Sequence, residues 1–222
     1  MILIATGLKQ ELNILDGAGV LVIAGGGDGA RLQRELEAAA ADAEAVISMG
    51  LCGALAPNLK PGDWVVATHI LGWSADAKWS AGLAQALRAQ SGPMLGSDAM
   101  IADAGAKAAA HAATGALAVD MESHIAAAVA RRHNLPFAVA RVVSDAADRS
   151  LPKAAQAGMA ADGSMDIGAV LKALAADPRQ LPALMRVGAE AGKAFRELRR
   201  GRDLLGPGLG RLDLMQHLLD MP

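Results

Sequence analysis

Short apolar segments alternate with helix-like segments through the first 150 residues, and no other feature constrains the fold as strongly. Strands are expected over residues 2–6, 20–24, 45–49, 64–68, 116–119 and 137–143, and helices over residues 30–41, 81–89, 106–113 and 125–131. Strands that alternate with helices pair mainly in parallel and carry the helices on the faces of the sheet. The alternation therefore predicts an α/β fold with a largely parallel sheet.

The C-terminal third differs in amino-acid composition from the first 150 residues. Residues 153–164 are rich in glycine and alanine, and two helices are expected to follow over residues 167–175 and 181–200. A length of 222 residues fits one domain, with a core over about residues 1–150 and a helical part over about residues 165–222. Hydrophobic residues make up 53% of the chain but aromatic residues only 2%, so alanine, leucine and valine must fill the core.

Charge and residue usage disfavour several classes of function. The net charge of −2 provides no general attraction to nucleic acid. Cys52 is the only cysteine, so no disulfide forms within the chain and a reducing cytosol is the natural setting. No apolar run approaches the ~18 residues that span a bilayer, and the histidines show no metal-ligand spacing. We therefore expect a cytoplasmic protein without a metal site.

The strongest candidate for chemistry lies where the last expected strand ends. The apolar run over residues 137–143 leads directly into Ser144 and Asp145, and Glu122 stands just before the preceding helix. Open α/β sheets bind ligands beyond the carboxyl ends of their strands, so the two carboxylates can converge on one pocket. The alternative is that both acids only cap or pair locally.

Two glycine-rich turns and one further acid follow the earlier strands. The turns span residues 25–29 and 49–54, and Glu11 lies in a polar turn over residues 9–11. A strand, a glycine turn and a helix N-terminus form a concavity of N–H groups that suits an anion. The first turn also matches the dinucleotide pattern Gly-x-Gly-x-x-Ala, but the next strand ends without an acid for the ribose. Glycines that only permit a turn, and a solvated Glu11, are the alternatives.

Taken in order, these motifs resemble the purine nucleoside phosphorylase and nucleosidase superfamily, and especially its methylthioadenosine/S-adenosylhomocysteine nucleosidase branch. The matching residues are Glu11, Gly50–Asp63, Ser97–Ile101, Val119–Glu122 and Arg141–Asp148. The resemblance implies a single-domain, three-layer fold whose central sheet is mixed but mostly parallel and is flanked by helices. It also implies cleavage of a purine–ribose bond by a homo-oligomeric enzyme without a cofactor, with phosphate as co-substrate in phosphorolytic members.

A narrower resemblance is to the hopanoid-associated phosphorylases, which are thought to remove adenine from adenosylhopane, a lipid-linked nucleoside. It is carried by residues 6–9, 25–28 and 151–200. The expected reaction is therefore release of adenine from adenosylhopane. Two alternatives within the superfamily are a methylthioadenosine/S-adenosylhomocysteine nucleosidase and a purine nucleoside phosphorylase. Outside it, a non-catalytic nucleoside- or dinucleotide-binding domain and a structural protomer with a degenerate pocket stay open.

By the same resemblance, three acids act on one bound nucleoside. Asp145 is the general acid at purine N7, and it must hold a proton at neutral pH, which an apolar pocket favours. Glu122 accepts hydrogen bonds from the ribose hydroxyls, and Met121 lies against the ribose. Glu11 activates the attacking water as the general base.

Further substrate contacts are implied at places where the family binds its ligand. They are Gly26, Gly50, Leu51, Met100 and Ser144. Ser144 and Arg141 are interpreted as supports of Asp145 and of the strand end, not as participants in the reaction. The family often has a base-stacking aromatic residue in place of Met100, for which a thioether is a softer substitute, and a small polar residue in place of Leu51.

Departures from the family pattern favour water over phosphate as the attacking group. Phosphorolytic bacterial members carry one arginine at the place of Ser48 and another in the turn around residues 9–13, and neither is present. A phosphate dianion without a guanidinium clamp is poorly held. Lys9, Arg31 and Arg149 are the residues that could supply the missing charge. The sequence therefore predicts hydrolysis.

The C-terminal segment is basic and rich in leucine. The range from Lys172 to Arg211 contains nine Lys or Arg residues and only four Asp or Glu residues. The leucine-rich stretch consists of Leu204, Leu205, Leu209, Leu212, Leu214, Met215, Leu218 and Leu219. Basic residues beside an apolar stripe can dock on an anionic membrane surface, which would suit a lipid-linked substrate. The alternative is that the segment packs on the domain or on a second subunit.

Overall fold

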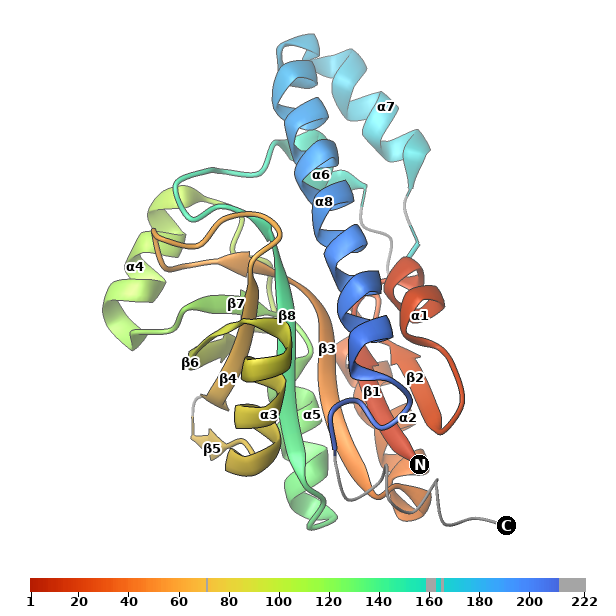
Figure 1. The fold of residues 1–222 in the computed structure, drawn as a ribbon. Helices are drawn as coiled ribbons and strands as arrows, with labels where there is room; N and C mark the ends of the chain where they lie inside the picture. The colour runs from red at the N-terminus through yellow and green to blue at the C-terminus, as the bar shows by residue number, and fades with distance from the viewer. Residues whose placement is uncertain (71, 159–162, 165, 212–222) are drawn as a thin grey trace.

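The computed structural model describes residues 1–70, 72–158, 163–164 and 166–211, which form an α/β fold (Figure 1). Its strands are β1 (Ile2–Thr6), β2 (Val20–Ala24), β3 (Ala45–Ala54), β4 (Trp64–Ile70), β5 (Trp73–Ser74), β6 (Gln90–Gly96), β7 (Ala118–Asp120) and β8 (Phe137–Asp145). Its helices are α1 (Lys9–Leu15), α2 (Gly29–Ala39), α3 (Ala77–Leu87), α4 (Ala104–Thr114), α5 (Ser123–Arg132), α6 (Lys153–Ala157), α7 (Ile167–Ala176) and α8 (Leu181–Leu205), with short 3₁₀ turns at Ala40–Asp42 and Pro178–Gln180.

The strands form one mixed sheet that closes on itself. The order β3–β7–β6–β4 is completed by β8, which pairs with both β4 and β3. Strands β1 and β2 extend this ring from β3, and β5 extends it from β4. Five pairings are parallel and three are antiparallel. The mostly parallel, mixed sheet is therefore confirmed, whereas its closure was not anticipated.

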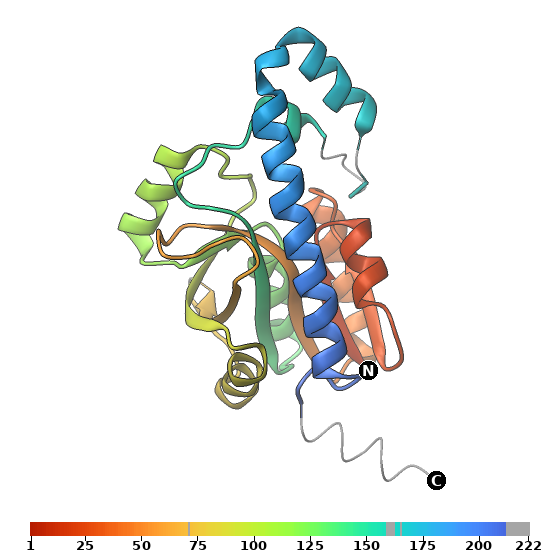
Figure 2. The same cartoon turned by 45° about the horizontal axis from the view of Figure 1, so that its top comes forward.

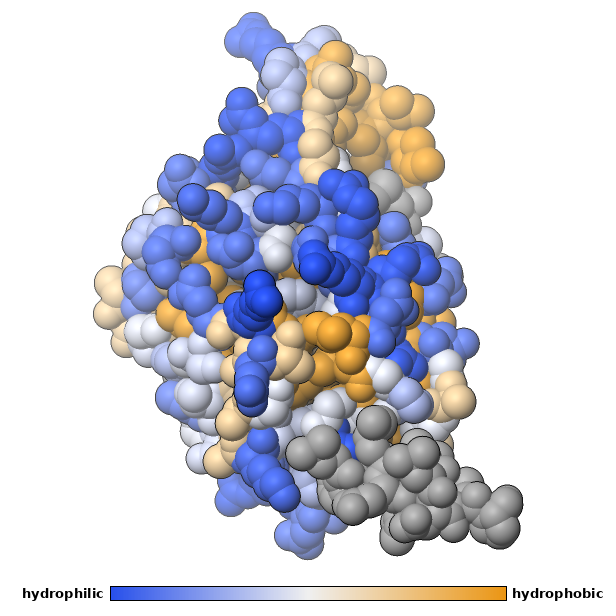
Figure 3. Space-filling view, viewed as in Figure 1, coloured by the Kyte–Doolittle hydropathy of each residue, from blue (hydrophilic) through white to orange (hydrophobic). Residues whose placement is uncertain are grey.

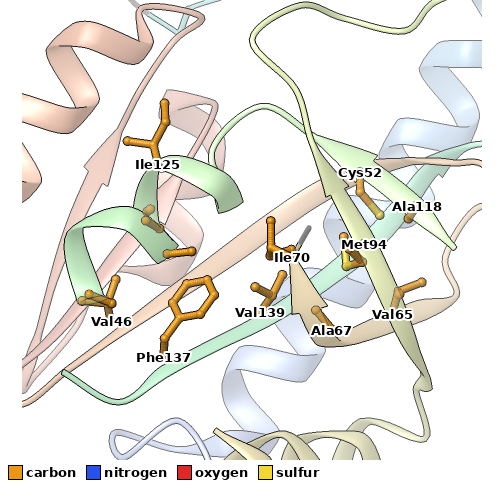
Figure 4. Close-up of a cluster of buried hydrophobic side chains, with 14 of the residues drawn as sticks. Val46, Cys52, Val65, Ala67, Ile70, Met94, Ala118, Ile125, Phe137 and Val139 are labelled. Atoms are coloured by element: carbon orange, nitrogen blue, oxygen red, sulfur yellow. The ribbon is translucent and has the colours of Figure 1, made fainter. Parts of the chain in front are cut away.

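Helices cover both faces of the sheet, and each face has its own core. Successive side chains of a strand point to opposite faces. Leu3 and Val46 pack with Leu32 of α2 and Ile125 of α5 on one face, part of which Figure 4 shows. Ile47 packs on the other face, where α1, α3 and α8 supply the helical layer. The expected three-layer arrangement is confirmed, and small aliphatic side chains fill both cores.

Two expected turns are regular structure instead. Residues 49–54 continue β3, because the glycines there allow close approach of neighbouring side chains and do not break the strand. Residues 9–11 begin α1, whose first turn is closed when the Glu11 side chain accepts the backbone N–H of Leu8. Strand β6 was also missed, since residues 90–96 include proline and two glycines and become a strand only by pairing between β4 and β7.

The last long helix fastens the C-terminal part to the sheet. Four residues in its second half are buried at helical spacing, namely Ala194, Leu198, Gly201 and Leu205. The first half of α8 and all of α7, which has no buried residue, extend beyond the sheet (Figures 1 and 2). Leu205 and Leu209 belong to the core, so these two leucines pack on the domain. The leucines expected over residues 212–219 lie outside the described residues.

No helix among residues 1–70, 72–158 and 166–211 is both long enough and apolar enough to cross a membrane.

Candidate active site

Glu11 lies in the first turn of α1 with its carboxylate buried, so the alternative of a solvated loop acid is wrong. Its Oε2 accepts hydrogen bonds from the Thr6 hydroxyl at 2.6 Å and from the backbone N–H groups of Gly7 at 2.8 Å and Leu8 at 2.6 Å. Its Oε1 accepts one from the backbone N–H of Leu51 at 2.6 Å. A carboxylate has about four acceptor positions shared between two oxygens. Oε1 is therefore the oxygen that can accept a further donor.

Two glycines leave the space that this carboxylate occupies. A Cβ on Gly50 would lie 2.7 Å from Glu11 Oε1 and 2.7 Å from Thr6 Oγ1. A Cβ on Gly7 would lie 2.9 Å from Glu122 Oε1 and 3.4 Å from Glu11 Oε2. Because one position at Gly7 contacts both carboxylates, the structure brings Glu11 and Glu122 together.

Glu122 is the residue immediately before α5, and Arg141 of β8 forms an ion pair with its carboxylate. The guanidinium Nη2 of Arg141 lies 3.0 Å from Glu122 Oε2, donates to Ser48 Oγ at 2.5 Å and lies 3.6 Å from Asp120 Oδ1. Its Nη1 donates to the carbonyl of Leu51 at 3.1 Å. Arg141 was interpreted as a support of Asp145, and this interpretation is wrong. It supports Glu122, because β8 carries it to the level of Gly50 on β3.

Burial governs the ionisation of this cluster. It raises the pKa of Glu122 to about 7, against the opposing effect of Arg141 and with a further upward contribution from Asp120 and Glu11. Burial alone would lower the pKa of Arg141, but Asp120 and Glu122 outweigh it and raise that pKa above its ordinary value. The arginine therefore stays charged while Glu122 titrates near neutrality.

Asp120 fixes the position of Glu122 through the backbone. Its Oδ1 accepts the backbone N–H groups of Glu122 at 2.8 Å and Ser123 at 2.6 Å. The Ser123 hydroxyl lies 2.5 Å from Asp120 Oδ2 and 2.9 Å from Ser48 Oγ. Asp120 thus satisfies the backbone N–H groups of Glu122, which precedes α5, and of Ser123, the first residue of the helix. Its place two positions before Glu122 in the sequence was the available signal for this role.

Asp145 ends β8 and is 7% exposed, but its surroundings are not the apolar pocket that was expected. Lys107 of α4, which is fully buried, donates from Nζ to Asp145 Oδ2. The Ser144 hydroxyl lies 2.7 Å from Asp145 Oδ1 and 3.1 Å from the carbonyl oxygen of Cys52. Sequence reasoning missed Lys107, because a single lysine in an alanine-rich helix has the pattern of a surface residue and its partner lies 38 positions away.

The buried thiol of Cys52 is affected by the charges of several of these acids. Burial raises the pKa of its thiol, and Asp120, Asp145 and Glu11 raise it further while Arg141 opposes them. The same stretch of β3 borders these charges directly, since Leu51 donates to Glu11, Gly50 pairs with Arg141, and a Cβ on Gly53 would lie 3.3 Å from Asp145 Oδ2. The two parts of the site are therefore the Glu11–Glu122 cluster and Asp145 farther along the strand.

A cavity of about 390 Å³ opens beside the first of these parts, between α2 and α5. Its lining residues are Gly25, Gly27, Gly29, Ala30, Leu32, Gln33, Trp73, Asp98, Met121, Glu122, His124, Ile125 and Ala128. Met121 and Glu122 thus face an open space, as a ribose site requires. Within the described chain, neither Glu11 nor Asp145 lines this cavity.

The first glycine turn is less suited to an anion than its pattern indicates. The N–H of Gly25 donates to the carbonyl of Thr6 at 2.7 Å, and the N–H of Gly26 donates to that of Gly7 at 2.8 Å. The guanidinium of Arg31 donates to the carbonyls of Ala24 and Gly25 at 2.9 Å. The two N–H groups fasten the turn to the end of β1, and Arg31 ties α2 to the turn and to the end of β2.

Two further expected residues, Met100 and Arg149, come from other segments of the chain. Met100 is half-buried in the segment between β6 and α4. Arg149 Nη1 lies 2.7 Å from Glu190 Oε1 on α8, so its charge is engaged there. No group of three or more His, Cys, Asp and Glu side chains in the described residues could hold a metal ion.

A sequence comparison identifies the family to which a chain with this fold belongs. The profile of the Phosphorylase superfamily matches residues 11–79 and 70–176. The chain therefore belongs to the phosphorylase superfamily. A comparison with curated proteins finds no match.

Solved structures with the same fold include several nucleosidases. S-adenosylhomocysteine nucleosidase from Streptococcus pyogenes, in complex with 5-methylthiotubericidin, is 23% identical with a TM-score of 0.58, over 66% of this chain and 84% of that chain. The 5′-methylthioadenosine/S-adenosylhomocysteine nucleosidase of Helicobacter pylori is 18% identical with a TM-score of 0.60, over 78% and 94%. A mutant futalosine hydrolase from Helicobacter pylori is 15% identical with a TM-score of 0.55, over 64% and 88%.

Proposed function

We propose that this protein cleaves the N-glycosidic bond of an adenine nucleoside. The observation that carries the proposal is the buried pair of carboxylates, Glu11 and Glu122, which meet at Gly7 beside a cavity. Burying two carboxylates costs several kcal/mol unless they are paired and hydrogen-bonded, so such an arrangement is typical of functional sites. The solved nucleosidases of the same fold support this reading.

Each acid has one role in the proposed reaction. Glu122 accepts hydrogen bonds from the ribose hydroxyls, and Met121 packs against the sugar. Both residues line the cavity. Glu11 accepts a proton from the attacking water at Oε1, the oxygen with the single protein donor. Asp145 donates a proton to N7 of the departing purine, with Ser144 beside it. Gly50 and Leu51 support Glu11, and Met100 and Gly26 are proposed to bound the substrate.

Water is the proposed attacking group. Ser48, where phosphorolytic members have an arginine, is buried and hydrogen-bonded to Ser123 and Arg141. Two of the three cations that could replace the missing clamp, Arg31 and Arg149, are held by backbone carbonyls or by Glu190. Arg141, the arginine at the site, is already bound to Glu122 and Ser48, so a phosphate dianion would find little uncommitted arginine charge there.

Adenosylhopane is the proposed substrate, and the protein is proposed to be cytoplasmic and homo-oligomeric, with peripheral contact to the membrane. The exposed apolar residues of α7 and α8 support a lipid-linked substrate. Methylthioadenosine and S-adenosylhomocysteine are the second candidates, since the solved structures of the same fold include nucleosidases for them. They need no membrane contact.

A substrate panel tests these proposals. The purified protein is incubated with adenosylhopane in vesicles, methylthioadenosine, S-adenosylhomocysteine and adenosine, with and without phosphate, and free adenine is measured. We expect the fastest release from adenosylhopane, with the lipid-linked sugar formed at the same rate as adenine in phosphate-free buffer. Activity only in phosphate would establish phosphorolysis. Absence of adenine release from every nucleoside, or equal release by Asp145→Asn, would refute the enzymatic proposal.

A further inference from the structure

Lys107 is a buried cation that the proposed reaction has not yet used. It lies one turn into α4, four residues after the capping residue Asp103, and its side chain is fully buried. Its ammonium donates to Asp145 Oδ2 and to the backbone carbonyls of Ala146 and Arg149, each at 3.0 Å. An ammonium has three N–H donors, so all three are used. The two carbonyls hold the charge in one place, against one oxygen of one carboxylate.

We propose that Lys107 is a positioning residue whose ammonium sets the charge state of Asp145 and stabilises its carboxylate during base release. The inference rests on the proposed function. A buried lysine is costly unless it is paired, and a buried pair alone seldom adds stability, so a lysine buried against Asp145 at the end of β8 indicates a role in the site. Because Lys107 occupies Oδ2, Oδ1 is the oxygen that carries the transferable proton.

Every proton in the step has a donor and an acceptor, and no further reactant is needed. The bond between ribose C1′ and purine N9 breaks, its electron pair enters the purine, and N7 takes the proton from Asp145 Oδ1. Water adds to C1′ and gives its proton to Glu11. The new Asp145 carboxylate is then paired with Lys107, and solvent returns the proton from Glu11 to Asp145. The products are adenine and the sugar.

Ser144 is placed to serve both states of Asp145. Its Oγ lies within hydrogen-bond distance of Asp145 Oδ1 and of the Cys52 carbonyl. When Asp145 is protonated, the hydroxyl accepts from Oδ1 and donates to Cys52. When Asp145 is ionised, the hydroxyl rotates and donates to Oδ1. The carboxyl group can thus lose its proton without leaving an unpaired donor.

Other ionisable groups lie around the pair and belong to three elements. Asp103 of α4 is close enough for Lys107 to contribute to the lowering of its pKa, after the larger effects of its hydrogen bonds with Ala106 and Ser150. Cys52 of β3 carries a neutral thiol because burial raises its pKa. The Arg149 side chain points to Glu190. Lys107 is therefore the cation in direct contact with Asp145.

The experiment follows Asp145 directly and does not depend on activity. Protein labelled with ¹³C at the aspartate carboxyl is titrated by NMR, and the Asp145 signal is identified by its loss in Asp145→Asn. We expect this carboxyl to titrate at higher pH in Lys107→Met than in the wild type, and near the wild-type pH in Lys107→Arg. An unchanged titration in a folded Lys107→Met protein would overturn the inference, and Lys107→Gln replaces that variant if it does not fold.

Kinetics then connect the charge state with adenine release. In Lys107→Met we expect kcat to fall by roughly 100-fold with little change in KM, as for loss of one preorganised donor, and the alkaline limb of the pH profile to move to higher pH. In an Asp145→Asn background the same substitution should cost less than about threefold, because the two residues act as a unit. Equal losses in both backgrounds would mean a structural lysine. A wild type without adenine release would refute the proposed function, while the NMR titration still decides the pairing.

Discussion

At the residue scale, the site depends on glycines whose role is to make room for side chains. Gly50 lies within β3, where a glycine ordinarily weakens a strand. Its missing Cβ is the space that the buried carboxylate of Glu11 occupies. The glycine is therefore explained by a side chain that lies 39 positions earlier in the sequence, which no local pattern reveals.

The first prediction concerns this contact. Gly50→Ala places a methyl group 2.7 Å from both Glu11 Oε1 and Thr6 Oγ1, which are buried and cannot move freely. We expect a loss of about 1–3 kcal/mol in the free energy of unfolding, as for other overpacked sites, with a fall in adenine release. Chemical denaturation measures the first effect. Gly82→Ala, whose nearest neighbour would lie at 3.7 Å, is the control and should show neither effect.

The second prediction concerns the titration of Glu122. Because burial raises its pKa to about 7, Glu122 is a carboxylate above that pH and a neutral acid below it. The charged form is the stronger acceptor for ribose hydroxyls, so KM should rise as the pH is lowered through 7. Glu122→Gln should raise KM above pH 7, where the wild-type side chain is charged, and remove this dependence. The proposed role of Glu122 would be refuted if wild type and variant showed the same pH profile of KM.

At the element scale, α8 is the helix that packs the C-terminal part against the sheet. Its buried stripe packs on β8, α1 and α3. The contact is closest at Gly201, where a Cβ would lie 2.3 Å from Trp64 Cζ2 of β4. Helix and strand approach each other here because position 201 has no side chain.

The third prediction uses two glycines of this one helix. Gly201→Ala should force α8 away from Trp64 and lower the free energy of unfolding by about 1–3 kcal/mol. Gly188→Ala meets nothing within 4 Å, so it should stabilise the helix by up to about 1 kcal/mol. Thermal denaturation of the two variants measures the difference. A Gly201→Ala protein as stable as Gly188→Ala would show that α8 is not packed against Trp64 as described.

The periodicity of apolar residues predicted most of the strands and helices, because it depends on which face of each element is buried. It failed where distant residues decide the local structure. Residues 49–54 have the composition of a turn but form a strand that pairs with β8 and β7, and β6 exists only through its partners. Glu11 and Glu122 meet as the resemblance implied, whereas Lys107 depends on a contact between α4 and β8 that has no sequence signature.

At the scale of the whole molecule, the sheet is a closed unit and the C-terminal helices project from it. The order of pairings closes β3, β7, β6, β4 and β8 into a ring, so this core has few free edges. By contrast, α7 and the first half of α8 expose large apolar side chains, which form the orange area at the upper right of Figure 3. Ile167, Leu171 and Met185 are 63%, 59% and 68% exposed.

The last prediction tests whether this projecting surface contacts a membrane. Lys172 and Arg186 are exposed next to Leu171 and Met185 in the sequence, a combination that suits an anionic bilayer. We expect sedimentation with anionic vesicles, weakening as salt is added, and at least about tenfold weaker binding for the double variant Leu171→Ser/Met185→Ser, since each buried apolar side chain contributes about 1.5–3 kcal/mol. Leu21→Ser is the control, because Leu21 is an exposed leucine on β2, outside α7 and α8. If the double variant sediments like the wild type, or neither binds vesicles, the surface has another partner, and the soluble thioadenosines become the better substrate candidates.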